Sequence, residues 1–235
     1  MIYYMGVDDT DIVGSPGTNR IVKAFLAKMP ASVRCERIIR HQLFFDPRVP
    51  YTSQNGSASL TFFLDDPTTV SLGDLTDLMR EHLKEHFVEG SDPGLCSATT
   101  VPEEVVEYGL RCKEELMTQD EAFGLAASLD IHLEGLGGTN DGIIGALAAI
   151  GLAATNDDGR IVQVGHWPED LAGLQSIETL AERGVEVELK TTGDSITTGR
   201  IDVGKKLRPN RSRGRDVLFV EETEERSVYR ALKLK

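Results

Sequence analysis

The sequence predicts a mixed α/β fold, with α+β mixed sheets, in two lobes. Apolar runs with strand-like and with helical spacing alternate along the chain, and neither repeats nor low-complexity tracts interrupt them. With 235 residues, 40% of them hydrophobic, the chain can build one large core or two modest ones. We divide it into 1–155, with 60–117 as a candidate inserted segment, and an accessory α/β lobe, 156–235.

The first half of the chain alternates between the two patterns. Strands are expected at 2–7, 37–45 and 57–64, and amphipathic helices at 19–29 and 72–87. Pro30 ends the first helix, and Pro102 suits the first position of a third. Thr118 and Glu121 form a capping-box signature for a fourth helix, which runs to about Asp130.

The second half begins with a helix that is apolar on almost every face, 143–154, which we expect to be central and closely packed. The remaining expectations are a helix over 169–183, ended by Gly184, and strands at 161–165, 185–189, 217–221 and 229–234.

Charge and hydropathy exclude some classes of protein. The net charge of −13 argues against a general nucleic-acid coat. No apolar run approaches the roughly 20 residues that cross a bilayer, and we expect a cytoplasmic protein. One loop segment is basic, through Lys205, Lys206, Arg208, Arg211, Arg213 and Arg215. It either binds phosphate or RNA, or balances the acidic body as a solvated loop.

Three aspartates, Asp8, Asp9 and Asp11, crowd directly behind the first expected strand. Like charges repel, and each carboxylate loses hydration if it is covered, so a cation should sit there. Mg²⁺ takes one or two carboxylates together with phosphate oxygens and water. Alternatively, the aspartates make Asx-turns. Thr18, at the mouth of the following helix, has the ordinary reading of an N-cap.

A second turn is rich in glycine and precedes the apolar helix. It includes Gly137, Gly138, Thr139, Asn140, Asp141, Gly142 and Gly145. Glycines let backbone amides approach phosphate oxygens, and the N-terminus of a helix attracts anions. A helix cap and tight packing explain these residues equally well. Together the two turns suggest one divided site, with Mg²⁺ on the aspartates and phosphates on the glycine turn.

Several segments resemble the archaeal agmatinylcytidine synthetases, which modify the wobble cytidine of an isoleucine tRNA. The likeness lies in GVDDTD with GT at Gly17–Thr18, in RIIRHQLFFDPRVPYTSQNGSA at 37–58, in DPGL at 92–95, and in GIIGALAAIG at 142–151. It covers about two thirds of the chain in the same order. The resemblance implies a kinase-like α/β lobe combined with a ferredoxin-like lobe.

The resemblance also implies chemistry. In that family ATP phosphorylates the cytosine carbonyl oxygen, and the amine of agmatine displaces the phosphate. By analogy Asp8, Asp9 and Asp11 would carry magnesium, and Thr18 would be a phosphoacceptor or relay. Gly142, Gly145 and their loop would line the ATP phosphates, and Asn55 and Gly56 would face the cleft.

Two differences shape the expected function. The family carries a lysine and an arginine where Thr52 and Gln54 stand here, and it continues into an OB-fold and a zinc ribbon. We therefore expect a shortened relative, a Mg²⁺- and ATP-dependent ligase or kinase-like enzyme that activates an acceptor oxygen. The alternatives are a tRNA cytidine-modifying enzyme that acts with a partner, and a nucleotide-binding regulator without catalysis.

Overall fold

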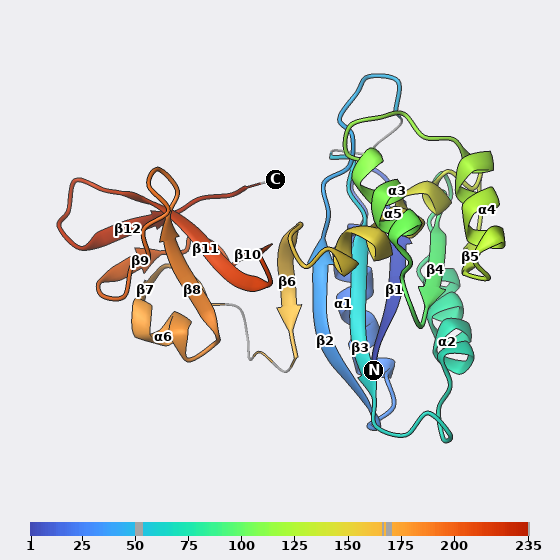
Figure 1. Ribbon diagram of the computed structural model, residues 1–235, viewed down its shortest axis with the longest axis horizontal. Coiled ribbons are helices and arrows are strands. Elements are labelled where there is room, and N and C mark those ends of the chain that lie inside the picture. The colour runs from blue at the N-terminus through green and yellow to red at the C-terminus, as the bar shows by residue number, and fades with distance from the viewer. Residues whose placement is uncertain (50–53, 166, 168–170, 235) are drawn as a thin grey trace. The chain divides into compact units, whose positions relative to one another are not determined.

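The computed structural model describes residues 1–49, 54–165, 167 and 171–234 (Figure 1). The chain forms two compact units. The first contains 1–155 with 162–165, and the second contains 156–161 with 166–235. The mixed α/β class predicted from the sequence is confirmed. Among the described residues no helix has the length and apolar content that a membrane crossing requires.

In the first unit the strands β5-β4-β1-β3-β2 follow one another in this order, and each neighbouring pair is antiparallel. The strands are β1 (Ile2–Asp8), β2 (Val33–Arg40), β3 (Ala58–Leu64), β4 (Gly94–Ala98) and β5 (His132–Gly135). The central strand, β1, pairs with both β3 and β4. Asp8 is the last residue of β1. The acidic turn therefore begins at the end of this central strand.

Helices cover both faces of this sheet, as their cores show. Against one face pack α1 (Thr18–Phe25), which continues as the 3₁₀ turn Leu26–Lys28, and α2 (Leu72–Glu85). Against the other pack α3 (Glu103–Arg111), α4 (Gln119–Ser128) and α5 (Gly142–Ala154). Figure 1 shows α3 and α5 together on one side of the strands.

Alternation along β1 divides its side chains between the two helical layers. Tyr3, Met5 and Val7 are buried with α1 and α2. The intervening residues point to the α5 side, where a Cβ at Gly6 would come within 1.9 Å of the Ala146 carbonyl oxygen. The missing Cβ lets α5 approach the strand closely. Asp8 falls in the same alternation and therefore faces α5.

In the second unit the strands β10 (Asn210–Ser212), β11 (Arg215–Glu222), β12 (Val228–Ala231), β9 (Arg200–Asp202) and β7 (Leu174–Ser176) follow one another in the strand order. A further strand, β8 (Val185–Leu189), pairs with β11 in parallel. One short helix among the described residues, α6 (Ile177–Ala181), packs with these strands around a separate apolar core. The remaining strand, β6 (Arg160–Val164), has residues in both units.

Most of the predicted elements are present, and two segments correct the expectations. The central helix is confirmed as α5, whose residues are almost all buried, and Thr118 caps α4 through the expected capping box. The strand expected over 37–45 ends at Arg40. Beyond it the His41 and Leu43 N–H groups still donate to the Ser57 and Asn55 carbonyls, at 2.9 and 3.0 Å, and the Phe44 N–H then donates to the Cys112 carbonyl at 2.8 Å.

The helix expected over 169–183 is confirmed only over 177–181. Residues 168–170 lie outside the described residues, 174–176 form β7, and only 177–181 are helical. Gly173 adopts a positive φ of 67°, and Ser176 caps the short helix by accepting a hydrogen bond from the Thr179 N–H at 3.2 Å. Pairing with β9 outweighs the local helical pattern.

Candidate functional site

The acidic turn and the glycine turn line one cavity in the first unit. From the two turns come Asp8, Asp9 and Asp11 and Asp141, Gly142 and Gly145. The cavity encloses about 180 Å³, far more than the roughly 10–15 Å³ that a single water needs. Two segments about 130 positions apart in the sequence thus meet around a space that can hold a ligand.

Backbone geometry turns the three aspartates toward the cavity. Asp9 follows the strand with a φ of 51°, a left-handed conformation that aspartate tolerates better than most residues. Its N–H donates to the Asp8 carboxylate at 2.8 Å, and its carbonyl accepts from the Asp92 N–H at 3.1 Å. The Asp8 bond reaches only the next residue, so it is not the Asx-turn expected as an alternative, although the Asp11 carboxylate does accept from a later amide, the Thr18 N–H, at 3.3 Å.

The aspartates strongly disfavour full ionisation. Burial first and then the charges of Asp9 and Asp11 raise the pKa of Asp8 to about 7, although the hydrogen bond from the Asp9 amide and the charge of Arg40 act in the opposite direction. Burial also raises the pKa of Asp9 to about 6, with repulsion from Asp92, Asp11 and Asp141. A cation among them would relieve this repulsion.

Thr18 lies behind the cavity wall. It is 4% exposed, and it is the first residue of α1, after Gly17 at the N-cap. The cap interpretation of Thr18 is therefore wrong. Its hydroxyl donates to the Asp11 carboxylate at 3.0 Å and accepts from the Thr10 hydroxyl at 3.1 Å. Through these bonds Thr18 orients Asp11.

Only part of the glycine turn reaches the cavity. Among the described lining residues, Asp141, Gly142 and Gly145 are present and Gly137, Gly138, Thr139 and Asn140 are not. Gly137 packs against the Phe87 ring and Gly138 against the Asp92 carboxylate, so close packing accounts for these two glycines.

Gly145 explains how the helix and the aspartates come so close. A Cβ at Gly145 would lie 1.7 Å from Asp8 Oδ2, which means that the carboxylate rests directly on the α5 backbone. Gly142 is equally close to the next strand, because its Cβ would lie 2.2 Å from the Asp92 carbonyl oxygen and 2.7 Å from the Gly94 nitrogen. The glycines of α5 thus set the depth of the cavity floor.

The first amides of α5 already have acceptors in the protein. The Gly142 N–H donates to the Asp92 carbonyl at 3.1 Å, the Ile143 N–H to the Asn140 carbonyl at 3.1 Å, and the Ile144 N–H to the Asp141 carbonyl at 3.2 Å. The Thr139 N–H donates to the Asp92 carboxylate. These four amides already donate to acceptors in the protein. The helix can therefore attract an anion in the cavity through the field of its dipole, but not through hydrogen bonds from these amides.

The opposite wall is formed mostly by residues that the sequence analysis did not single out. They are Leu43, Phe44, Val49, Cys112, Glu115, Leu116, Met117 and Ile144, and with them lie Gln54, Asn55 and Gly56, which the resemblance had named. The Asn55 side-chain amide donates to the Phe44 carbonyl at 2.8 Å and fixes this loop. The wall is largely apolar. Burial raises the pKa of the Cys112 thiol to about 12, so it is not a nucleophile at neutral pH.

The cavity is strongly anionic. Five carboxylates line it, those of Asp8, Asp9, Asp11, Glu115 and Asp141, and its described lining residues include no lysine or arginine. Of the two positions where the family has cations, Gln54 lines the cavity, and Thr52 lies outside the described residues. Arg40 is a nearby cation, and its guanidinium packs against Gly56.

The basic segment forms ion pairs in the second unit. Arg211 bonds Asp216 at 2.6 Å, Arg213 bonds Glu188 at 2.6 Å, and Arg215 contacts both Glu186 and Glu188. Lys205, Lys206 and Arg208 precede these residues, and both lysines are exposed. Arg211, Arg213 and Arg215 thus balance acidic partners, but they do so in and between the strands β10 and β11, not in the solvated loop that the alternative expected.

Comparison with known proteins supports the resemblance at the level of the fold. No protein-family model and no curated protein matches this chain. Among solved structures, the complex of TiaS with tRNA(Ile2) and ATP has a TM-score of 0.56 at 23% identity, over 64% of this chain and 36% of that one. Apo TiaS, a tRNA(Ile2) agmatidine synthetase, has a TM-score of 0.51 at 24% identity, over 64% and 35%.

A third structure, TiaS with tRNA(Ile2), AMPCPP and agmatine, has a TM-score of 0.52 at 21% identity, over 64% of this chain and 36% of that one. This chain thus spans about a third of the synthetase's length. The three structures share a fold with it and confirm the resemblance drawn from the sequence in that respect.

Proposed function

We propose that this protein is a Mg²⁺-dependent enzyme that uses ATP to activate an acceptor oxygen by phosphorylation. One observation carries the proposal: the acidic turn and the start of α5 line a single cavity in a fold shared with a synthetase whose complexes contain ATP or AMPCPP. Neither turn alone would support it, since acidic clusters and glycine turns are common in unrelated proteins.

The residues fit a hard divalent cation. Carboxylate oxygens are the ligands that Mg²⁺ prefers, and Asp8, Asp9 and Asp11 supply them from one turn. Their raised pKa values show that the turn holds more negative charge than it can stabilise alone. Asp8, Asp9 and Asp11 would hold Mg²⁺, which would supply positive charge near the phosphate during phosphoryl transfer.

The chain's own residues would divide the remaining work. Thr18 holds the Asp11 carboxylate in position, and Gly145 leaves the space in which Asp8 lies. The apolar side chains of Leu43, Phe44 and Leu116 suit the base of a nucleotide and exclude water from the reacting phosphate. With Thr18 buried and hydrogen-bonded, we assign it a relay role through Asp11 rather than that of a phosphoacceptor.

The acceptor and the incoming nucleophile follow from the fold comparison alone. Agmatine and tRNA(Ile2) are present in the synthetase complexes, which favours a small amine and a nucleobase oxygen as substrates here. tRNA is the further partner that we propose, through the exposed Lys205 and Lys206 of the basic segment. Affinity for tRNA would then fall steeply with salt concentration.

A second candidate function is a nucleotide-binding regulator that does not catalyse phosphoryl transfer. It is favoured by the scarcity of cationic side chains, since the described residues that line the cavity include no lysine or arginine. Phosphoryl transfer requires positive charge around the moving phosphate, and here Mg²⁺ would have to provide most of it.

Labelled ATP distinguishes the two functions. The full chain is incubated with γ-labelled ATP, agmatine and tRNA, with Mg²⁺ or EDTA, and both phosphate release and binding of a nonhydrolysable analogue are measured. Asp9→Asn is compared with Asp130→Asn, because both aspartates have a positive φ, 51° and 54°, but only Asp9 lines the cavity.

The enzyme reading predicts Mg²⁺-dependent phosphate release that Asp9→Asn abolishes and Asp130→Asn preserves. Saturable, Mg²⁺-dependent analogue binding without turnover under any of these conditions favours the regulator. Absence of any ATP binding at millimolar Mg²⁺ refutes both functions.

A further inference from the structure

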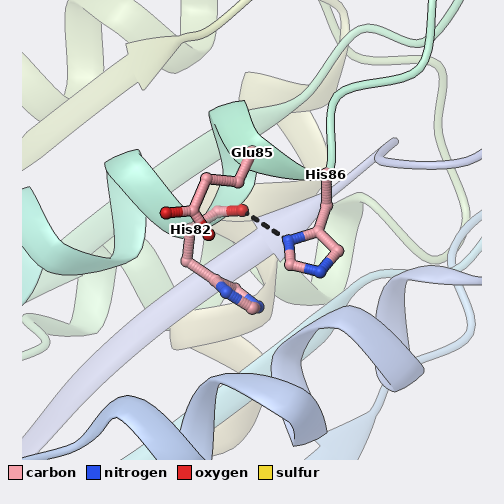
Figure 2. A group of neighbouring side chains, drawn as sticks. All are labelled: His82, Glu85 and His86. Carbon is pink, nitrogen blue, oxygen red and sulfur yellow. Dashed lines mark hydrogen bonds between the residues drawn. The ribbon is translucent and has the colours of Figure 1, made fainter.

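The last turn of α2 places three metal-ligating side chains next to one another. They belong to the sequence H-L-K-E-H, which supplies His82, Glu85 and His86. One ligand atom of each lies within 4.8 Å of the others, and the ring centroids of the two histidines are 4.4 Å apart. Figure 2 shows the two rings side by side at the end of the helix. Histidines at i and i+4 share a helix face, a spacing that zinc-binding helices use.

Hydrogen bonds prepare one nitrogen of each ring to act as a ligand. His82 Nε2 lies 3.0 Å from the Ile21 carbonyl oxygen, and His86 Nδ1 lies 2.8 Å from the His82 carbonyl oxygen. A carbonyl can only accept, so these two nitrogens carry the protons. His82 Nδ1 and His86 Nε2 therefore hold the lone pairs. Metal-binding histidines commonly donate their other N–H to a carbonyl in this way.

His82 Nδ1 lacks a partner in the protein. The residue is 1% exposed, and this atom is buried without a hydrogen bond. Leaving a buried acceptor unsatisfied costs about 1–3 kcal/mol, which calls for a ligand at that position. The carboxylate of Glu85 is at the surface, where it pairs with Lys28. The third ligand is thus already negatively charged and held near the rings.

We propose that His82, Glu85 and His86 form a binding site for a transition metal ion, with Zn²⁺ as the best match. Two imidazoles and one carboxylate suit Zn²⁺, and three protein ligands leave a fourth position for water or another group. The three residues are not among those that line the acidic cavity. The site is therefore independent of the proposed magnesium site, whose oxygen ligands suit a harder ion.

The ion would join two helices of the same layer. His82 belongs to α2, while its ring N–H is held by the carbonyl of Ile21 in α1, and Lys28 follows α1 in the 3₁₀ turn. Zn²⁺ at His82 would satisfy its buried nitrogen and fix the end of α2 against α1. Binding to the folded chain alone raises its thermal stability.

The test uses the full chain, stripped with EDTA and returned to buffer with excess Mg²⁺, which occupies oxygen-rich sites. Zn²⁺ is titrated by calorimetry, and the melting temperature is recorded with and without it. Two exposed ligands are changed in turn, His86→Gln and Glu85→Gln, so the buried core is left intact. His132→Gln is the matched control, since His132 is an exposed histidine 2.9 Å from a glutamate, Glu134.

We expect one Zn²⁺ per chain and a higher melting temperature. His86→Gln should weaken binding by at least about 100-fold, because loss even of a partner behind a ligand costs about 10- to 100-fold. His132→Gln should bind as the wild type does. The proposal is overturned if the wild type shows no saturable Zn²⁺ binding, if His86→Gln keeps wild-type affinity, or if Asp9→Asn removes the binding instead.

Discussion

Replacing Gly145 by alanine is the sharpest test of how α5 and the acidic turn form one site. The added Cβ would lie 1.7 Å from Asp8 Oδ2 and 2.6 Å from its Cγ. To reach ordinary contact, the carboxylate and the helix must separate by roughly 1.5 Å. Asp8 also accepts the Asp9 N–H at 2.8 Å, so its displacement disturbs the neighbouring carboxylate as well.

The expected losses in binding and in stability differ. Misplacing a catalytic group by about 1 Å can cost about 100-fold in rate, so Mg²⁺-dependent ATP turnover should fall by about that factor. Overpacking costs about 1–3 kcal/mol, while alanine in place of a helical glycine returns about 1 kcal/mol. The free energy of unfolding should therefore fall by no more than about 2 kcal/mol, which leaves most of the about 5–15 kcal/mol typical of a domain.

Phosphate release from γ-labelled ATP measures the turnover, calorimetry with a nonhydrolysable ATP analogue and Mg²⁺ measures the binding, and urea denaturation measures the stability. Gly124→Ala is the matched control, because Gly124 lies within α4 and a Cβ there meets nothing within 4 Å. This variant should be slightly more stable and should bind normally. If Gly145→Ala binds the Mg²⁺–ATP analogue with wild-type affinity, Asp8 is not part of the binding site.

Three further predictions concern stability, each measured by urea denaturation. Leu147→Ala, at a fully buried position of α5, should lower the free energy of unfolding by about 2–5 kcal/mol, whereas Leu110→Ala, 48% exposed on α3, should cost far less. Thr118→Ala removes the capping box of α4 and should cost about 1 kcal/mol, so an unchanged value would contradict the capping assignment. In EDTA, stability should decrease as pH rises from about 4 to 7, because folded Asp8, with a pKa of about 7, still holds a proton that the unfolded chain has released. After allowance for solvent screening the contribution of Asp8 is about 2 kcal/mol, which Asp8→Asn should remove, while Asp9, whose pKa is raised to about 6, continues to contribute a change in the same direction.

Elements with strong local signals could be predicted from the sequence. α5 is apolar on nearly every face, a pattern that only a buried helix tolerates, and the capping box of α4 is defined by two residues three positions apart. β7 could not be predicted, because Leu174–Ser176 is a strand only through its pairing with β9. β4 was not predicted, since its small residues, Gly94–Ala98, show no alternation in polarity and are buried throughout.

The candidate site likewise has one part that the sequence predicts and another that depends on tertiary contacts. Both turns could be recognised because aspartates behind a strand and glycines before a helix are local patterns. The opposite wall depends on tertiary contacts such as the hydrogen bond from the Phe44 N–H to the Cys112 carbonyl. No local sequence pattern predicts such a contact. His82 was missed because the decisive observation, an unpartnered buried nitrogen, exists only once α1 packs against α2.

The acidic turn is costly for the fold in the absence of a cation, and the fold nevertheless holds it rigidly. Asp11 is fixed by Thr18, Asp8 by the Asp9 amide and by the surface of Gly145, and Asp9 by the Asp92 amide. A chain under selection for stability alone would relax this repulsion with an asparagine or a longer turn, because each carboxylate could be neutralised without loss of packing. The carboxylates are held close together before a cation binds. A bound cation relieves the repulsion among them, and this relief adds to the affinity of the turn for the cation. The arrangement therefore favours a function in which binding of a divalent ion at this turn precedes any chemistry in the cavity.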